Sequence, residues 1–127
     1  MGEIWDIYDK EGNKTGRTIV RGEELKEGDY HLVVHIWIMN DNKEFLIQRR
    51  AADLELLPNI WAATGGAAIQ GEDSLTAAIR EVEEELGIKP ISDRMERINR
   101  IYREDSFADV WLLQQNANLD DIELQKE

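Results

Sequence analysis

The chain has 127 residues, a net charge of −12, 42% hydrophobic residues and no cysteine. A chain of this length can bury a core of its own, so we expect residues 1–127 to form a single domain. The strong acidity argues against a nucleic-acid partner, because such partners need a basic surface. The lack of cysteine excludes disulfides, thiolate metal sites and a cysteine nucleophile.

The sequence contains no signal for membrane insertion or export. No apolar run approaches the length of a membrane span, and the N-terminal residues MGEIWDIYDK lack the basic and apolar regions of a signal peptide. We therefore predict a cytoplasmic protein without membrane contact. An anionic substrate of so acidic a chain must be received by a local basic group or by a metal ion.

The first third of the chain predicts strands. Residues 4–8 alternate apolar and polar side chains, and residues 17–21 resume the pattern after a turn-rich segment, which indicates a hairpin. Residues 21–29 predict a short helical turn followed by a loop. Residues 30–39, YHLVVHIWIM, give the strongest strand signal, and so apolar a strand is expected to be covered on both faces.

His31 lies on one face of this strand together with His35. A histidine in a strand is commonly a hydrogen-bonded structural residue, and phosphate binding is the functional alternative. Arg49 and Arg50 end the next predicted strand, residues 45–50, before a loop that leads to a glycine-rich segment. A guanidinium group can grip a diphosphate through two parallel bonds, and the alternative is a pair of surface salt bridges. Alternation points the two arginines to opposite faces, so at most one reaches a common site.

Residues 74–86 predict an amphipathic helix. Asp73 or Ser74 can serve as its N-cap, and Gly87 is a natural residue for its C-terminal end. At about 100° per residue, an apolar stripe follows one side of the helix. Its members are Leu75, Ile79, Val82 and Leu86. After the helix, residues 98–102 and 109–113 indicate a hairpin.

The other side of the helix is acidic. With Glu81 as the origin, Glu85 falls at roughly +40° and Glu84 at roughly −60°, so three carboxylates share one sector. Like charges at these spacings repel one another, and a divalent cation relieves the repulsion. Magnesium and manganese prefer oxygen ligands of this kind. The alternative is an acidic helix face that is simply solvated.

The surrounding residues fit the pattern Gly-x5-Glu-x7-Arg-Glu-U-x-Glu-Glu-x-Gly-U, in which U is aliphatic. The matching positions are Gly66, Glu72, Arg80, Glu81, Val82, Glu84, Glu85, Gly87 and Ile88, and every specified position is filled. This segment resembles the Nudix box, the signature of the Nudix hydrolase superfamily. The flanks differ, because many members carry Pro and Glu where this chain has Thr64 and Ile69.

The resemblance implies a fold, a reaction and a set of roles. The implied fold is an α/β/α sandwich with a mixed β-sheet. The implied reaction is attack of water on a phosphorus atom of a nucleoside diphosphate linked to another moiety, with Mg²⁺ or Mn²⁺ as cofactor. In the family pattern Glu81 is a metal ligand or the base, Glu84 and Glu85 are ligands, and Arg80 and Glu72 orient them. A carbonyl of Gly65 or Gly66 is a further candidate ligand.

The segments WDIYDKEGNKTGR, YHLVVHIWI, FLIQRR and WAATGG resemble a Nudix branch close to the isopentenyl-diphosphate isomerases. Domains of that branch usually continue past the position of Glu127, so we expect the last strand and the C-terminal helix to be missing. The isomerase reaction is an alternative function, but those enzymes use a cysteine that this chain lacks. A second alternative is a module that binds metal and nucleotide without turnover. A homodimer is a further expectation.

Overall fold

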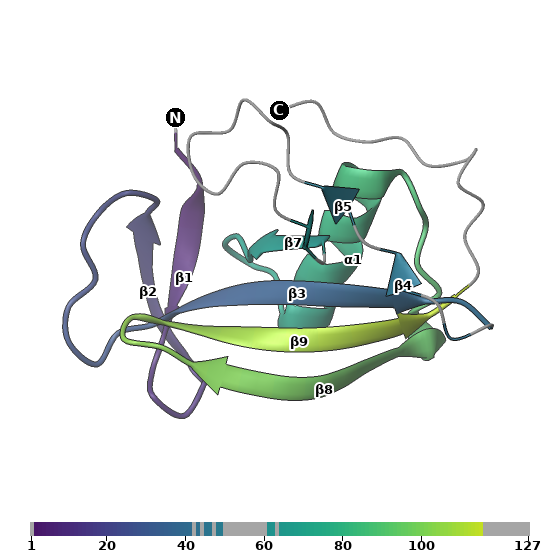
Figure 1. Cartoon of the computed structure of the whole chain (residues 1–127). Coiled ribbons are helices and arrows are strands. Elements are labelled where there is room, and N and C mark those ends of the chain that lie inside the picture. Colours follow the sequence, from purple (N-terminus) through teal and green to yellow (C-terminus); the bar gives the residue numbers. More distant parts are fainter. Residues whose placement is uncertain are drawn as a thin grey trace.

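The computed structural model describes residues 2–41, 43, 45, 46, 48, 49, 61, 62 and 64–115. In this part of the chain a mixed β-sheet is crossed on one face by a helix (Figure 1). The elements are β1 (Ile4–Tyr8), β2 (Lys14–Val20), β3 (His31–Met39), β4 (Phe45–Leu46), β5 (Gln48–Arg49), β6 (Trp61–Ala62), β7 (Thr64–Ala67), α1 (Ser74–Leu86), the 3-10 helix η1 (Ser92–Arg94), β8 (Met95–Tyr102) and β9 (Ser106–Gln114).

The strand β3 is the centre of the main sheet, whose order is β4-β3-β9-β8. It pairs in parallel with β9 and antiparallel with β4 and β7, while β8 and β9 form an antiparallel hairpin. The hairpin β1–β2 is a separate sheet at one end of β3 (Figure 1). The predicted mixed sheet and the predicted N-terminal hairpin are therefore confirmed.

Helix α1 has the predicted bounds. Asp73 is its N-cap, and the carboxylate of this residue accepts a hydrogen bond from Thr76 N at 2.7 Å. Gly87 follows the helix in the left-handed conformation with φ 70°, and its N–H donates to Glu83 O at 3.0 Å. Both ends thus satisfy backbone groups that a helix leaves without intrahelical partners.

The buried face of α1 matches the predicted stripe in part, since Val82 and Leu86 are buried as expected. Leu75 and Ile79 are only partly buried, whereas Ala77 and Ala78 are fully buried between the helix and the sheet. The buried arc also includes Glu81. Two adjacent alanines let the helix lie close to β3, and this close approach turns part of the acidic sector toward the sheet.

The faces of β3 are unequal. Leu32, Val34, Ile36 and Ile38 are buried in the core that α1 covers, while the alternate residues remain partly exposed in the described structure. The expectation of cover on both faces is therefore only half met among these residues. Residues 21–29 form turns without the expected helical turn. Across the described part of the chain, none of the helices has the length and apolar character that crossing a bilayer requires.

Strand β7 leaves no room for a side chain at Gly65. A Cβ atom at this position would lie 2.2 Å from the carbonyl oxygen of Val34 and 3.1 Å from His35 Cα. Both atoms belong to the backbone of β3, so they cannot move aside without disturbing the central strand. Gly65 thus permits the close approach of β7 to β3.

We predict that Gly65→Ala lowers the free energy of unfolding by about 3 kcal/mol, because the added methyl group forces the two strands apart. Gly28→Ala is the control. Gly28 has φ +88° and open space around it, so alanine there costs only the left-handed conformation, about 1 kcal/mol. Urea unfolding of both variants measures the difference, and equal losses would contradict the packing role of Gly65.

Candidate functional site

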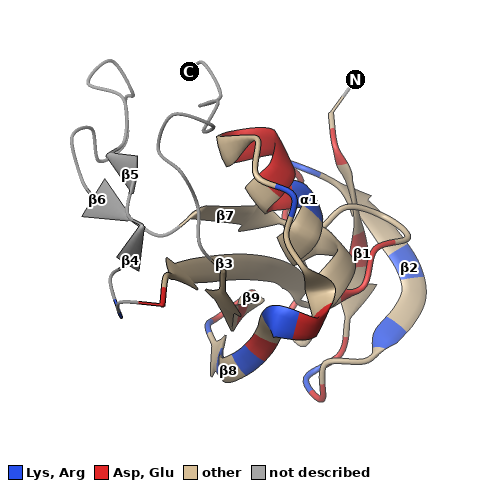
Figure 2. Ribbon diagram, turned by 90° about the vertical axis from the view of Figure 1, so that its right-hand side faces the viewer, with Lys and Arg blue, Asp and Glu red and all other residues tan. Residues whose placement is uncertain are grey.

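The candidate site lies where α1 faces β7, and acidic residues occupy one end of the helix (Figure 2). Glu81 is 9% exposed and its carboxylate lies against Gly66. A Cβ atom at Gly66 would be 2.7 Å from Oε1 and 2.9 Å from Oε2 of that carboxylate. Glycine is therefore required at this position to make room for the glutamate, and not to supply a positive φ.

Arg80 joins the acidic residues to the loop between β7 and α1. Its Nε and Nη2 atoms donate to the two oxygens of Glu72 at 2.6 and 2.9 Å. Its Nη1 donates to Glu81 Oε1 at 3.0 Å and to Glu84 Oε2 at 3.1 Å, and Nη2 also donates to Ala67 O at 3.1 Å. These five bonds match the five N–H groups of a guanidinium.

The pair of Glu72 and Arg80 holds the loop in place. Glu72 is 8% exposed, and it also accepts a hydrogen bond from Ile69 N at 2.9 Å. Burial raises the pKa of Glu72, but the bonds from Arg80 and Ile69 N more than offset this effect and lower it below its ordinary value. The carboxylate is therefore ionised at neutral pH and keeps the loop attached to the helix.

The carboxyl groups of Glu81 and Glu85 form a hydrogen bond with each other. Burial raises the pKa of Glu81, the charge of Arg80 opposes this effect, and the hydrogen bond with Glu85 adds to it, so that the pKa is about 7. Thr64 Oγ1 donates to Glu85 Oε2 at 2.5 Å, so Glu85 is also held from β7. The carboxyl groups of Glu81 and Glu85 therefore lie side by side and concentrate acidic groups at this site.

The donors suit a hard divalent cation in chemistry, since all are carboxylate or carbonyl oxygens. In the described residues no three His, Cys, Asp or Glu side chains already converge on one point. The side chain of Glu84 is instead hydrogen-bonded to Arg80. The Glu84 side chain is 52% exposed, and an ion pair this exposed is worth less than about 1 kcal/mol. Rotation of Glu84 toward Glu81 and Glu85 therefore costs little, and the residues fit the implied ion.

The other predicted site residues lie elsewhere or are not described. His31 is on the face of β3 opposite α1, where its ring stacks on Trp5 with centroids 4.2 Å apart. Burial lowers its pKa, and its Nδ1 atom has no hydrogen-bond partner. The structure thus does not bring His31 together with the glutamates of α1. The backbone of Arg49 is part of β5, whereas its side chain and the whole of Arg50 lie outside the described residues.

Two contacts of the site escape sequence reasoning. In the sequence, Thr64 is recognised only because it differs from the residue that usually flanks the box. Its hydrogen bond to Glu85 depends on the pairing of β7 with β3. Asp6 accepts a hydrogen bond from Gly71 N across a separation of 65 residues. No local pattern marks a partner so distant in the chain.

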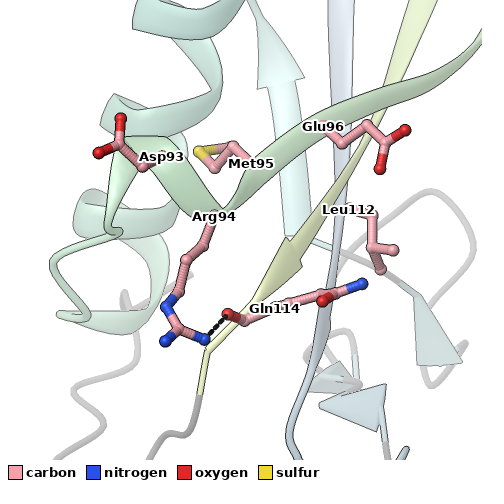
Figure 3. Close-up of a pocket in the computed structure, with 6 residues that line it drawn as sticks. All are labelled: Asp93, Arg94, Met95, Glu96, Leu112 and Gln114. Atoms are coloured by element: carbon pink, nitrogen blue, oxygen red, sulfur yellow. Dashed lines mark hydrogen bonds between the residues drawn. The ribbon is translucent and has the colours of Figure 1, made fainter.

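A separate hollow of about 210 Å³ lies near η1 and the hairpin of β8 and β9 (Figure 3). Its lining consists of Asp93, Arg94, Met95, Glu96, Leu112 and Gln114. Arg94 Nη1 donates to Gln114 O at 3.3 Å, so its guanidinium already has an acceptor in the wall. None of the predicted site residues contributes to this hollow.

Comparison with known proteins identifies the family to which this sheet, this helix and the Arg80 network belong. Residues 29–123 match the model of the NUDIX domain. A Nudix hydrolase of Listeria monocytogenes is 40% identical over 126 residues, which cover 98% of this chain and 75% of that protein. Nudix hydrolase 3 of Arabidopsis thaliana is 41% identical over 76% of this chain and 13% of its own length.

Among solved structures, the protein DR0079 of Deinococcus radiodurans superposes with a TM-score of 0.71 and 25% identity, over 96% of this chain and 80% of that one. The chain belongs to the Nudix family, and the predicted Nudix α/β/α sandwich is confirmed. It is an enzyme of the pyrophosphohydrolase type, from a family that acts on nucleotide derivatives with a divalent metal ion. Its place beside the isopentenyl-diphosphate isomerases stays a prediction.

The raised pKa of Glu81 predicts a pH-dependent effect of Glu81→Gln on the metal-free protein. The pKa of Glu81 is about 7 in the folded state and near 4.5 in the unfolded chain, so the folded state binds the proton more tightly. The contribution of this proton to stability is therefore fully present below pH 4.5 and is lost as the pH rises through about 7. Glutamine imitates the protonated acid. At pH 8 the variant should unfold with a larger free energy than the wild type, by at most about 3 kcal/mol, and at pH 4.5 or below the difference should vanish.

Denaturant unfolding in a chelator at both pH values measures this effect. Glu83→Gln is the matched control, because Glu83 is exposed on the same helix and its substitution removes the same formal charge. A Glu81→Gln variant that is less stable than the wild type at pH 8 would contradict the raised pKa of Glu81.

Proposed function

We propose that this chain hydrolyses a nucleoside diphosphate linked to another moiety, by attack of water on phosphorus with Mg²⁺ or Mn²⁺ as cofactor. The observation that carries the proposal is the set of glutamates on α1, which Arg80 and Glu72 orient. Phosphoryl transfer depends on alignment and charge neutralisation more than on covalent help from the protein. An oriented cluster of carboxylates is the arrangement that such chemistry requires.

Each residue of the box has a role in this proposal. Glu81, Glu84 and Glu85 would hold the ion, and the carbonyl of Gly66 is a further candidate ligand. A divalent ion held there neutralises charge on the diphosphate and lowers the pKa of water. Arg80 fixes the direction of Glu81 through its hydrogen bond to that carboxylate, and Glu84 would exchange its bond to Arg80 for the ion.

Glu81 is also the candidate base. Its carboxylate is buried against Gly66 and receives one bond from Arg80, so its direction is fixed before substrate binds. A fixed carboxylate can accept a proton from an attacking water molecule without a further reorganisation of the protein. The alternative roles of ligand and base stay open for this residue.

The substrate's phosphates need a cationic partner, and we propose Arg49 or Arg50 for this role. The net charge of −12 gives a local arginine particular value, because the rest of the chain repels an anion. For His31, stacking on Trp5 favours a structural role, and phosphate binding by this residue stays a prediction.

A module that binds nucleotide without turnover is the second candidate. It is favoured by one observation, that Arg80 holds Glu84 by a hydrogen bond that a ligand role for Glu84 would have to replace. The isomerase alternative is disfavoured by the lack of cysteine. In either hydrolase or module we propose that residues 1–127 act as one domain. The cytoplasmic location, the homodimer and the exclusion of nucleic acid stay predictions.

We predict that the purified chain cleaves one class of nucleoside diphosphate derivative only when Mg²⁺ or Mn²⁺ is added. Glu81→Gln should lower turnover by roughly 100-fold or more, because both of its possible roles need an ionised carboxylate. Glu83→Gln should keep turnover within about 2-fold, since this exposed residue lies off the site. Chromatography of products from a panel of such compounds, with and without metal, gives the measurement.

The outcomes separate the two candidates. Unaltered turnover in Glu81→Gln would mean that another residue carries the reaction. Calorimetric binding of nucleotide and metal without any product would favour the binding module. If the chain shows no turnover and its melting temperature does not rise with metal, both proposals are removed.

A further inference from the structure

The N-terminal hairpin contacts the loop of the Nudix box, although it lies outside residues 29–123, which match the family model. The backbone of β1 accepts a hydrogen bond at Ile4 O from Gln70 N, at 2.8 Å. Two residues further along β1, Asp6 Oδ2 accepts from Gly71 N at 2.9 Å. The hairpin thus touches the two residues that directly precede Glu72.

These two bonds complete the hydrogen bonding of the loop. Every backbone N–H from residue 68 to residue 72 has an acceptor. Ala68 N donates to β3, Ile69 N donates to the side chain of Glu72, and Glu72 N donates back to Ile69 O. Only the N–H groups of Gln70 and Gly71 depend on the hairpin. Without the hairpin, the middle of the loop would have no protein acceptor among these contacts.

Gly71 lies at a turn of the loop with open space on its side-chain face. It has φ +89°, and no atom lies within 4 Å of the place where a Cβ would stand. A side chain would find no packing partner here beyond the chain neighbours, and the bond to Asp6 is the contact of its N–H. A bond to an ionised carboxylate is stronger than one to a neutral acceptor.

Asp6 is itself held in place. Its side chain is 14% exposed, and Lys14 Nζ lies 3.1 Å from the same oxygen that receives the Gly71 N–H. The strand that carries it is anchored to the main sheet by reciprocal bonds between Tyr8 and Tyr30, at 2.7 and 2.9 Å. The stack of Trp5 on the ring of His31 adds a second anchor.

We propose that Asp6 is a positioning residue for the hydrolytic site. By fixing Gly71 it places the adjacent Glu72, which in turn holds the guanidinium of Arg80 against Glu81 and Glu84. The inference rests on the function proposed above. It adds a residue that lies outside the box and acts through Gly71, Glu72 and Arg80.

Two substitutions of Asp6 test the role. Asp6→Ala removes the acceptor for Gly71 N, and it should lower kcat roughly 10-fold or more, with KM changed less than about 3-fold. Mn²⁺ affinity, measured from the paramagnetic signal of the free ion, should fall by a similar factor. Asp6→Asn keeps an oxygen acceptor and should restore most of both losses, because the geometry of the loop survives without the full charge.

The matched control is Asp9→Ala in the same hairpin. Asp9 Oδ1 accepts bonds from Glu11 N and Asn13 N, so its loss disturbs the hairpin turn but no contact with the box loop. This variant should keep kcat and Mn²⁺ affinity within about 2-fold of the wild type. Equal losses in Asp6→Ala and Asp9→Ala would overturn the proposal in favour of a general effect of hairpin stability.

A measurement on the wild-type chain needs no variant. If the bond from Gly71 N to Asp6 favours metal binding, metal binding must favour that bond by the same factor. Mg²⁺ should therefore slow hydrogen exchange at the Gly71 amide, and unchanged exchange in a chain that binds Mg²⁺ would overturn the proposal, even if Asp6→Ala did not fold. A wild type that neither binds metal nor turns over would instead remove the proposed function, and this role with it.

Discussion

The ion pair of Arg80 and Glu72 is the interaction on which the rest of the site depends. It joins a loop to a helix through two bonds between mostly buried groups, at 2.6 and 2.9 Å. Loss of one partner would leave a charge in a poorly solvated place, at a cost of about 3–5 kcal/mol. The remaining N–H groups of Arg80 all have acceptors, so the planar fork of arginine is needed and lysine could not replace it.

This pair also explains how four carboxylates can share so small a volume. One guanidinium cannot balance Glu72, Glu81, Glu84 and Glu85, so the excess negative charge is relieved in different ways along the helix. Glu84 is largely solvated, whereas Glu81 is buried and relieves the repulsion by a raised pKa and a bond to Glu85. Burial of Glu81 is thus expensive in the isolated protein, which is the expected state of a site built for a cation.

The features that a local sequence pattern determines were predicted from the sequence. Helix α1 and its caps follow from periodicity and from Asp73 and Gly87, and the family follows from one continuous motif. The buried face of α1 was predicted only in part, because Val82 and Leu86 are buried as expected, whereas packing selected Ala77 and Ala78 in place of the larger Leu75 and Ile79. Alanine scores poorly as a core residue in a pattern, yet only a small side chain allows the helix to approach the sheet.

Contacts between distant segments could not be predicted in this way, and the bond from Gly71 to Asp6 is the clearest example. Glycine in a turn is common, and aspartate within a strand, although depleted there, indicates no particular partner. Their meeting depends on how the hairpin docks on β3, which Tyr8 and Trp5 decide through tertiary contacts. A motif can therefore indicate the candidate carboxylates of a site, while the accuracy of their placement depends on residues outside the motif.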